Sequence, residues 1–224
     1  MDVLDAVLEL KREGLIRSVG GESMPSALIK ESEALGFGYD SIQGTCNVLD
    51  QRFLSEMQPF WHENNMIMLA SSTLAGGLLS EQFYNLKQKD LLFPQLTARQ
   101  KFHTKTIHQW AKGNDSGMSP WQLYEKHILR VIGEISLKHR VPLASVAMRW
   151  VVQQDGVGSA LIRTAVGRID RTKELRNVFS FELDDDDLQA INDARNQGIL
   201  HGNSGSIPAT PSLADMMNNR KLWL

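Results

Sequence analysis

Short apolar runs alternate with amphipathic segments along much of the chain. Apolar residues spaced three and four positions apart predict helices, and the compact apolar runs between them predict strands. The predicted strands are 15–20, 39–43, 66–70 and 158–162. Each of the first two gaps between strands holds one predicted helix, which is typical of a parallel sheet with helices outside it.

Glycine, proline and capping residues set the ends of the predicted helices. Gly14 ends a helix over 2–13, Pro25 starts the next helix, and Gly36 ends it. Asp50 is predicted to cap a third helix, in which Pro59 predicts a kink or a break. Further helices are expected over 119–139, from Pro142 to 152, over 168–178 and over 184–194.

Segment 82–118 interrupts this alternation, because it is polar and irregular. His103 and His108 lie five residues apart, which does not place them on one helical face, so we expect solvated histidines. The acidic run 184–187 precedes an apolar helix and predicts a helix cap. No metal site is predicted from either group.

Strand count and chain length both favour half of a barrel. A closed eight-stranded α/β barrel takes ~250 residues, whereas this chain has 224 residues and four predicted strands. The expected fold class is therefore α/β: a partial (β/α)8 TIM barrel with about four parallel strands, outer helices and a long insertion after the third strand. We expect the barrel-like part to span 1–197 and an extended tail to span 198–224.

An open parallel sheet of this kind has consequences for solubility. Strands 15–20 and 158–162 should each present an unpaired edge, although parallel edges are buried in most proteins. The concave face should be apolar, with Val19, Ile42, Leu69 and Leu161 as its members. We therefore expect self-association, poor solubility or partial unfolding of the purified chain.

Composition excludes several classes of protein. Apolar residues make up 42% of the chain, charged residues 22%, and the formal net charge is −2, which fits one soluble domain without a nucleic-acid-binding surface. The longest apolar run, 66–70, is far shorter than the ~20 residues of a membrane span. Cys46 is the single cysteine, and the N-terminal residues match neither a signal peptide nor a transit peptide, so a cytoplasmic location is expected.

Five stretches together resemble the C-terminal half of the aldo/keto reductase family. They are LKREGLIRSVG (10–20), NVLDQR (47–52), STLAGGLLSEQF (72–83), KHRVPLASVAMRWVV (138–152) and VFSFEL (178–183), in the order and spacing of the family. The resemblance implies an (α/β)8 barrel that binds NADP(H), or NAD(H) in some members, and reduces aldehydes and ketones. It also implies that the catalytic Asp, Tyr, Lys and His, which the family carries on barrel strands one to four, are absent, so no catalytic residue is assigned.

The same resemblance assigns residues to the cofactor. Gln43 matches the family glutamine that binds the nicotinamide carboxamide, and Ser23 could add one hydrogen bond. Ser71 stands where the family places a stacking aromatic ring. Leu74 and Gly76 belong to a small-residue turn that either admits the pyrophosphate or only joins a strand to a helix. The positions near the adenosine end are Arg163, Arg168, Arg171 and Glu174.

Several of these positions depart from the family pattern. Glu22 brings an acid near the nicotinamide, although a solvated loop acid is the plainer interpretation, and Ser71 cannot stack. Arg163 replaces a family glycine, and Ala165 replaces a family basic residue. These departures predict weak NADP(H) binding or none.

Three functions stay open. The chain could be an NADP(H)-dependent oxidoreductase of the aldo/keto reductase family represented by its cofactor-side half. It could be a non-catalytic relative that binds a nucleotide weakly or serves as an interaction module, or a truncated gene product. Expected partners are a second copy or a complementary half barrel, and neither nucleic acid nor a membrane.

Overall fold

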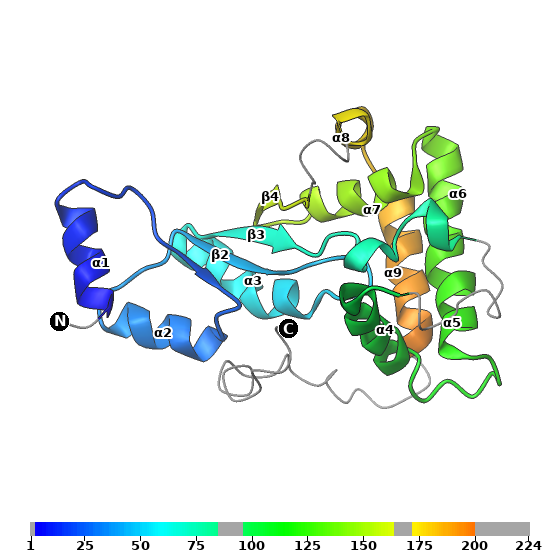
Figure 1. Cartoon of the computed structure of the whole chain (residues 1–224), viewed down its shortest axis with the longest axis horizontal. Coiled ribbons are helices and arrows are strands. Elements are labelled where there is room, and N and C mark those ends of the chain that lie inside the picture. Colours follow the sequence, from blue (N-terminus) through cyan, green and yellow to red (C-terminus); the bar gives the residue numbers. More distant parts are fainter. Residues whose placement is uncertain (1–2, 85–95, 164–171, 200–224) are drawn as a thin grey trace.

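Four parallel strands form one sheet in a computed structural model that describes residues 3–84, 96–163 and 172–199. The strands are β1 (Gly20–Glu22), β2 (Ser41–Thr45), β3 (Ile67–Ser71) and β4 (Val157–Ala160), and they lie side by side in that order (Figure 1). All three pairings are parallel. The predicted α/β class and strand order are therefore confirmed, and in the described ranges the sheet does not close into a barrel.

The first strand lies later in the chain than predicted. The predicted strand 15–20 overlaps β1 only at Gly20. The carboxylate of Asp40 accepts the backbone N–H of Val19 at 2.7 Å, and the Asp40 N–H donates to the Val19 carbonyl at 2.8 Å. The Asp40 carboxylate thus takes the place of a backbone acceptor for the Val19 N–H. Regular pairing of β1 with β2 begins one residue later, at Gly20. Leu15, which the apolar run placed inside a strand, is 69% exposed.

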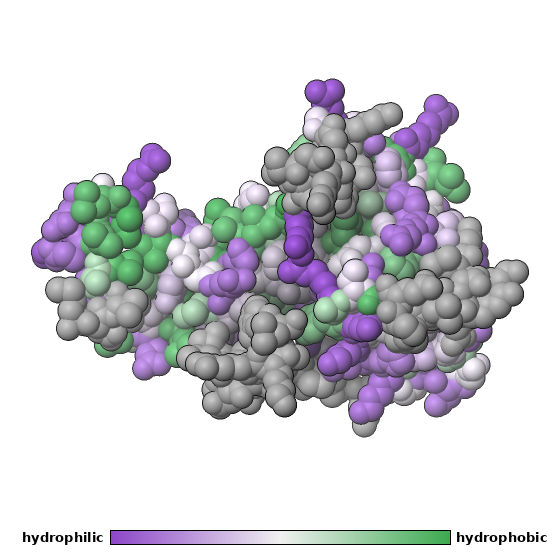
Figure 2. All heavy atoms as spheres, viewed as in Figure 1, coloured by the Kyte–Doolittle hydropathy of each residue, from purple (hydrophilic) through white to green (hydrophobic). Residues whose placement is uncertain are grey.

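Three helices accompany the first three strands. They are α1 (Val3–Arg12), α2 (Ser26–Ala34) and α3 (Arg52–Asn64). Helix α3 runs on through Pro59 and is capped by Asn65 in the left-handed conformation, so of the kink or break predicted at Pro59 the break is wrong. Helix α1 stands at the far left of Figure 1, beyond α2, and Figure 2 shows apolar side chains gathered on the surface there.

The insertion after β3 contains a regular helix, so the expectation of an irregular segment is wrong for α4 (Ala98–Trp110). Thr97 accepts the N–H of Gln100, and the Gln100 side chain accepts the N–H of Thr97, which is a capping box. Helix α4 buries Ile107 and Trp110 although most of its other residues are polar. In the sequence, the capping residues Thr97 and Gln100 indicate the start of this helix, whereas the spacing of apolar residues does not predict it.

The remaining elements form the larger group of helices at the right of Figure 1. They are η1 (Ala75–Gly77), η2 (Glu81–Phe83), α5 (Pro120–Leu123), η5 (Tyr124–Leu129), which is a π-helical turn, α6 (Arg130–His139), α7 (Leu143–Val152), α8 (Thr172–Val178) and α9 (Asp185–Ile199). Asp184 accepts the N–H of Asp187 at 2.9 Å, which confirms the predicted acidic cap. No helix in the described ranges is both long and apolar enough to cross a bilayer.

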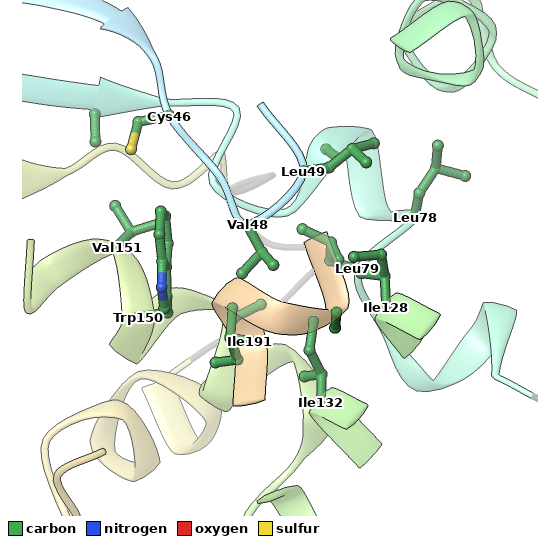
Figure 3. Packing of buried hydrophobic residues seen from close by; sticks show 14 of the residues in the cluster. Cys46, Val48, Leu49, Leu78, Leu79, Ile128, Ile132, Trp150, Val151 and Ile191 are labelled. Atoms are coloured by element: carbon green, nitrogen blue, oxygen red, sulfur yellow. The ribbon is translucent and has the colours of Figure 1, made fainter. Parts of the chain in front are cut away.

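One hydrophobic core joins the strand ends to these helices (Figure 3). Residues of the loops that follow β2 and β3 pack against α7, α9 and the π-helical turn, as shown by Val48, Leu49, Leu78, Leu79, Ile128, Trp150 and Ile191. Trp110 of α4 and Trp121 of α5 are buried in the same core. The core therefore fixes the loops at the C-terminal ends of the strands.

The two faces of the sheet differ in polarity. In β2, Ile42 and Gly44 are buried on the helix-covered face, where a Cβ on Gly44 would lie 2.1 Å from the ring of Phe53. Gln43 alternates to the opposite face. The predicted apolar concave face is thus wrong at Ile42, which points toward the helices. The opposite face, called the open face below, is mostly polar: it carries Ser41, Gln43, Thr45, Ser71 and Ser159 together with the apolar Ile67 and Leu69.

Candidate functional site

Polar side chains meet at the C-terminal ends of β1, β2 and β3. Glu22 lies opposite Gln43 in the register of β1 and β2, and Ser71 lies opposite Thr45 in the register of β2 and β3. All of them project from the face away from the helices. In α/β barrels the functional groups sit at this end of the strands. The structure therefore brings the predicted residues Gln43 and Ser71 together at the C-terminal ends of the strands.

Gln43 is held by an acid. Its amide Nε2 donates to Glu22 Oε1 at 2.8 Å. Glu22 belongs to β1, so its interpretation as a loop acid is wrong, although its side chain is exposed. One donor of the amide is therefore occupied, and a carboxylate lies beside the position where a carboxamide would bind.

Ser23 lies directly beyond this pair. It has a positive φ of 51°, and its N–H donates to the Gln43 carbonyl at 2.7 Å. Residues other than glycine adopt this conformation rarely, so the bond to Gln43 helps to hold the turn. The turn places the exposed Ser23 side chain next to the Glu22–Gln43 pair.

The hydroxyl of Ser71 is directed at the backbone. Ser71 Oγ donates to the Gly44 carbonyl at 3.1 Å, and the Ser71 carbonyl accepts the N–H of Cys46 at 3.0 Å. The side chain therefore extends the pairing of β2 with β3. A serine in this position offers no ring on which a nicotinamide could stack.

Asn47 joins the two loops that follow β2 and β3. Its Oδ1 accepts the N–H groups of Leu49 and Asp50 at 3.1 and 2.9 Å, and its Nδ2 donates to the Ser72 carbonyl at 3.1 Å. Asn47 is fully buried. A buried amide with these bonds satisfied fixes both loops relative to one another.

The turn after β3 is built from left-handed residues. Positive φ values occur at Ser72, Ala75, Gly76 and Gly77. A Cβ on Gly76 would lie 3.2 Å from His103 Cδ2 and 3.3 Å from Arg99 Cγ, so helix α4 packs closely on the turn. Leu74 is half-buried against the core. The small residues of this turn therefore have a structural role, whether or not a pyrophosphate binds there.

Asp50 forms a buried ion pair with Arg52. Asp50 Oδ1 and Oδ2 accept from Arg52 Nε and Nη2 at 2.8 and 2.6 Å, and the Asp50 side chain is 7% exposed. Gln51 occupies the helix cap position without a side-chain bond, and Asp50 Oδ1 accepts the N–H of Arg52, the first residue of α3, at 3.4 Å, so Asp50 caps the helix from one residue further out than its assigned cap. The carboxylate raises the pKa of Arg52, and it adds to the burial that raises the pKa of Cys46 to about 12. The Cys46 thiol therefore stays protonated.

His103 is buried in α4 and is 2% exposed, so the expectation of a solvated histidine is wrong for this residue. His108 is exposed, as expected. Burial, opposed by the negative charge of Asp50 and aided by the positive charge of Arg99, lowers the pKa of His103 to about 4. The imidazole is therefore neutral at physiological pH and packs as part of the turn that contains Gly76.

Acid should destabilise the fold through His103. Its pKa is about 4 in the folded chain and 6.5 in a model peptide, so between these pH values the unfolded chain binds a proton that the folded chain does not. Stability should be complete above pH 6.5 and fall by about 3 kcal/mol as the pH drops to 4. Urea unfolding at several pH values should show this slope. His103→Gln should flatten it, whereas the control His108→Gln should retain it.

Arg99 was missed by the sequence analysis. It occupies the first turn of α4, is exposed, and contacts the glycine turn. The Thr97–Gln100 capping box locates this helix start, so the signal was present in the sequence. The Cγ of Arg99 lies against this turn, and the residue is exposed to solvent.

The adenosine-side predictions are only partly covered by the structure. Arg163 follows β4 and is exposed. Arg168 and Arg171 lie outside the described residues. Glu174 lies in α8, and its side chain is not described. Within the described ranges no three potential metal-ligating side chains come together.

Comparisons with known proteins agree with this architecture. A protein-family model described as "Aldo/keto reductase family" matches residues 1–196 of this chain. A 9,11-endoperoxide prostaglandin H2 reductase of Trypanosoma cruzi is 24% identical over 152 residues, which cover 65% of this chain and 52% of that protein.

Solved structures show the same fold. The glycerol dehydrogenase AKR11B4 from Gluconobacter oxydans has a TM-score of 0.68 and 18% identity, with 89% of this chain and 55% of that chain covered. The holo form of aldo-keto reductase AKR11C1 from Bacillus halodurans has a TM-score of 0.57 and 22% identity, with 85% and 54% covered. A mutant of Gox0644 in complex with NADPH has a TM-score of 0.53 and 21% identity, with 85% and 51% covered.

This chain spans about half the length of the relatives that it matches. The family match covers most of the chain itself and ends beside the predicted boundary at residue 197. The chain belongs to the aldo/keto reductase family.

Proposed function

We propose that this chain is the cofactor-side half of an aldo/keto reductase-type oxidoreductase and that it binds NADP(H) at the C-terminal ends of its strands. The family match supports the reaction class, and a related structure contains NADPH. A reducing, cytoplasmic setting fits the single buried Cys46. Bound NADPH would supply the hydride for carbonyl reduction.

One observation carries this proposal: the Gln43 amide lies at the C-terminal end of its strand, and the Gly76–Gly77 turn, which Arg99 contacts, follows the neighbouring strand β3. Gln43 can bind a carboxamide with its remaining donor and its acceptor. At Gly77 a Cβ would meet only Gln100 Nε2, at 3.9 Å, so the backbone of the turn can approach a diphosphate there. Arg99, in contact with that turn, would neutralise part of the diphosphate charge.

Affinity for the cofactor should be low. Glu22 occupies one donor of Gln43 and repels an anionic ligand. Ser71 removes a stacking contact that is worth about 0.5–1.5 kcal/mol beyond area burial. Both residues border the nicotinamide position and not the diphosphate position. We therefore assign binding chiefly to the turn and to Arg99.

Titration of NADPH into the chain, followed by cofactor fluorescence, tests this assignment. Arg99→Ala should weaken binding about tenfold, because a hydrogen bond to a charged group is worth about 1.5–3 kcal/mol and Arg99 is exposed to solvent. Lys101→Ala, which removes an exposed cation from the same helix, is the matched control and should leave binding unchanged. Equal effects of the two variants would contradict a specific site at the turn.

A non-catalytic interaction module is the second candidate. The Glu22–Gln43 bond favours this second candidate, because one donor of the amide that would bind the nicotinamide carboxamide is already bonded to Glu22. No detectable binding of NADPH at millimolar concentration would select this candidate over the first. A truncated gene product would bind neither NADPH nor a protein partner.

A further inference from the structure

Both outer edges of the sheet lack a strand neighbour within the described ranges. On either side of β1, the Val19 carbonyl accepts the N–H of Asp40, just before β2, at 2.8 Å, and the Ser23 N–H donates to Gln43 of β2 at 2.7 Å. Backbone groups of successive residues in a strand point to alternate sides, so Gly20 and Glu22 direct their N–H and C=O groups outward. An unsatisfied parallel edge of this kind is a template for pairing with another chain.

Apolar side chains accompany the two edges. Leu15 precedes β1 and is 69% exposed, and Leu161 follows β4 and is 38% exposed. Ile67, at the start of β3, is 44% exposed on the open face. On α1, Leu8 and Leu10 are 38% and 39% exposed. Pairing at the edges would remove part of this surface from water.

We propose that a second copy of this chain covers both edges, with β1 of one copy pairing in parallel with β4 of the other. All four strands run in the same direction, so a twofold axis along the strands brings each β1 edge to a β4 edge. The two sheets then close a ring of eight strands, which is the number in the α/β barrel. Two equivalent seams result.

Charges at the seams favour this pairing of unlike edges. Glu22 ends β1, and Arg163 follows the end of β4, so parallel pairing brings one copy's acid near the other copy's base. Both side chains are exposed. Pairing of β1 with β1 would instead bring like charges together at one seam. The enclosed interior would carry Gln43, Thr45 and Ser71, so it would hold water or a ligand and not a dry core.

Light scattering at micromolar protein concentration tests the dimer. The expected mass is twice the 25.2 kDa of one chain. Glu22→Pro removes an outward N–H without touching the groups of β1 that bond to β2, and it should yield a monomer. Glu22→Ala keeps that N–H and is the matched control, which should remain dimeric. Circular dichroism of each variant verifies that the chain is folded.

A charge exchange tests the identity of the partner edge. Glu22→Arg and Arg163→Glu should each weaken self-association about tenfold or more, because each places like charges at both seams. Mixing the two variants should restore a dimer, since both seams of the mixed dimer then join unlike charges. A monomeric wild-type chain, a dimeric Glu22→Pro variant, or a mixture as weak as its components would overturn the proposal.

Discussion

The purified chain should not reduce 4-nitrobenzaldehyde with NADPH, even when the cofactor is bound. General acid catalysis contributes about 10²–10⁴-fold to a rate, and correct positioning of the reactants contributes more. The tyrosines of this chain are poorly placed as proton donors to a carbonyl. Tyr124 is fully buried, with a pKa raised by that burial, and Tyr39 packs edge-on against Phe37 at 4.9 Å.

Tyr84, the third tyrosine, directly follows η2, and its ring packs on Gly133 of α6. Oxidation of NADPH, followed by its absorbance, should therefore give a turnover at least ~10⁴-fold below the ~10 s⁻¹ of a median enzyme. Retention of the folded state during the assay is verified by circular dichroism. A turnover near that of a median enzyme would show that a proton donor is present after all, and Tyr39→Phe and Tyr84→Phe would then identify it.

Removing the carboxylate of Asp50 should cost about 3–5 kcal/mol of unfolding free energy, the usual effect of breaking a buried ion pair on one side. Asp50 is almost fully buried and receives two bonds from Arg52, whose side chain is 23% exposed. Because Arg52 keeps some solvent contact, the lower end of that range is expected for Asp50→Ala. Urea unfolding monitored by tryptophan fluorescence gives the difference.

Two variants serve as controls for Asp50. Asp50→Asn keeps an acceptor for Arg52 and should give a smaller loss than Asp50→Ala. Glu134→Gln breaks the exposed pair of Glu134 with Arg130 and should leave the unfolding midpoint unchanged. A loss below about 1 kcal/mol for Asp50→Ala would mean that the pair contributes little and that Asn47 alone holds the loop.

The candidate site was predictable where it depends on position along a strand. Gln43 and Ser71 were assigned by the resemblance to the aldo/keto reductase family, which matches them to the ends of two strands, and parallel strands bring such ends together. The bond between Gln43 and Glu22 was not predictable, because it depends on the register of β1 against β2. A shift of that register by one residue would place Glu22 on the opposite face.

The sequence by itself predicted four parallel strands, their order and the helices between the first three, because apolar spacing and capping residues act over a few neighbouring positions, although it placed β1 too early and did not predict α4. Only the tertiary structure decided that Ile42 faces the helices, that His103 is buried, and that the open face is polar. Burial depends on which element lies opposite a residue, and that element is often far away in the sequence. His103 is buried by the turn of Gly76, which lies before the insertion that carries the histidine.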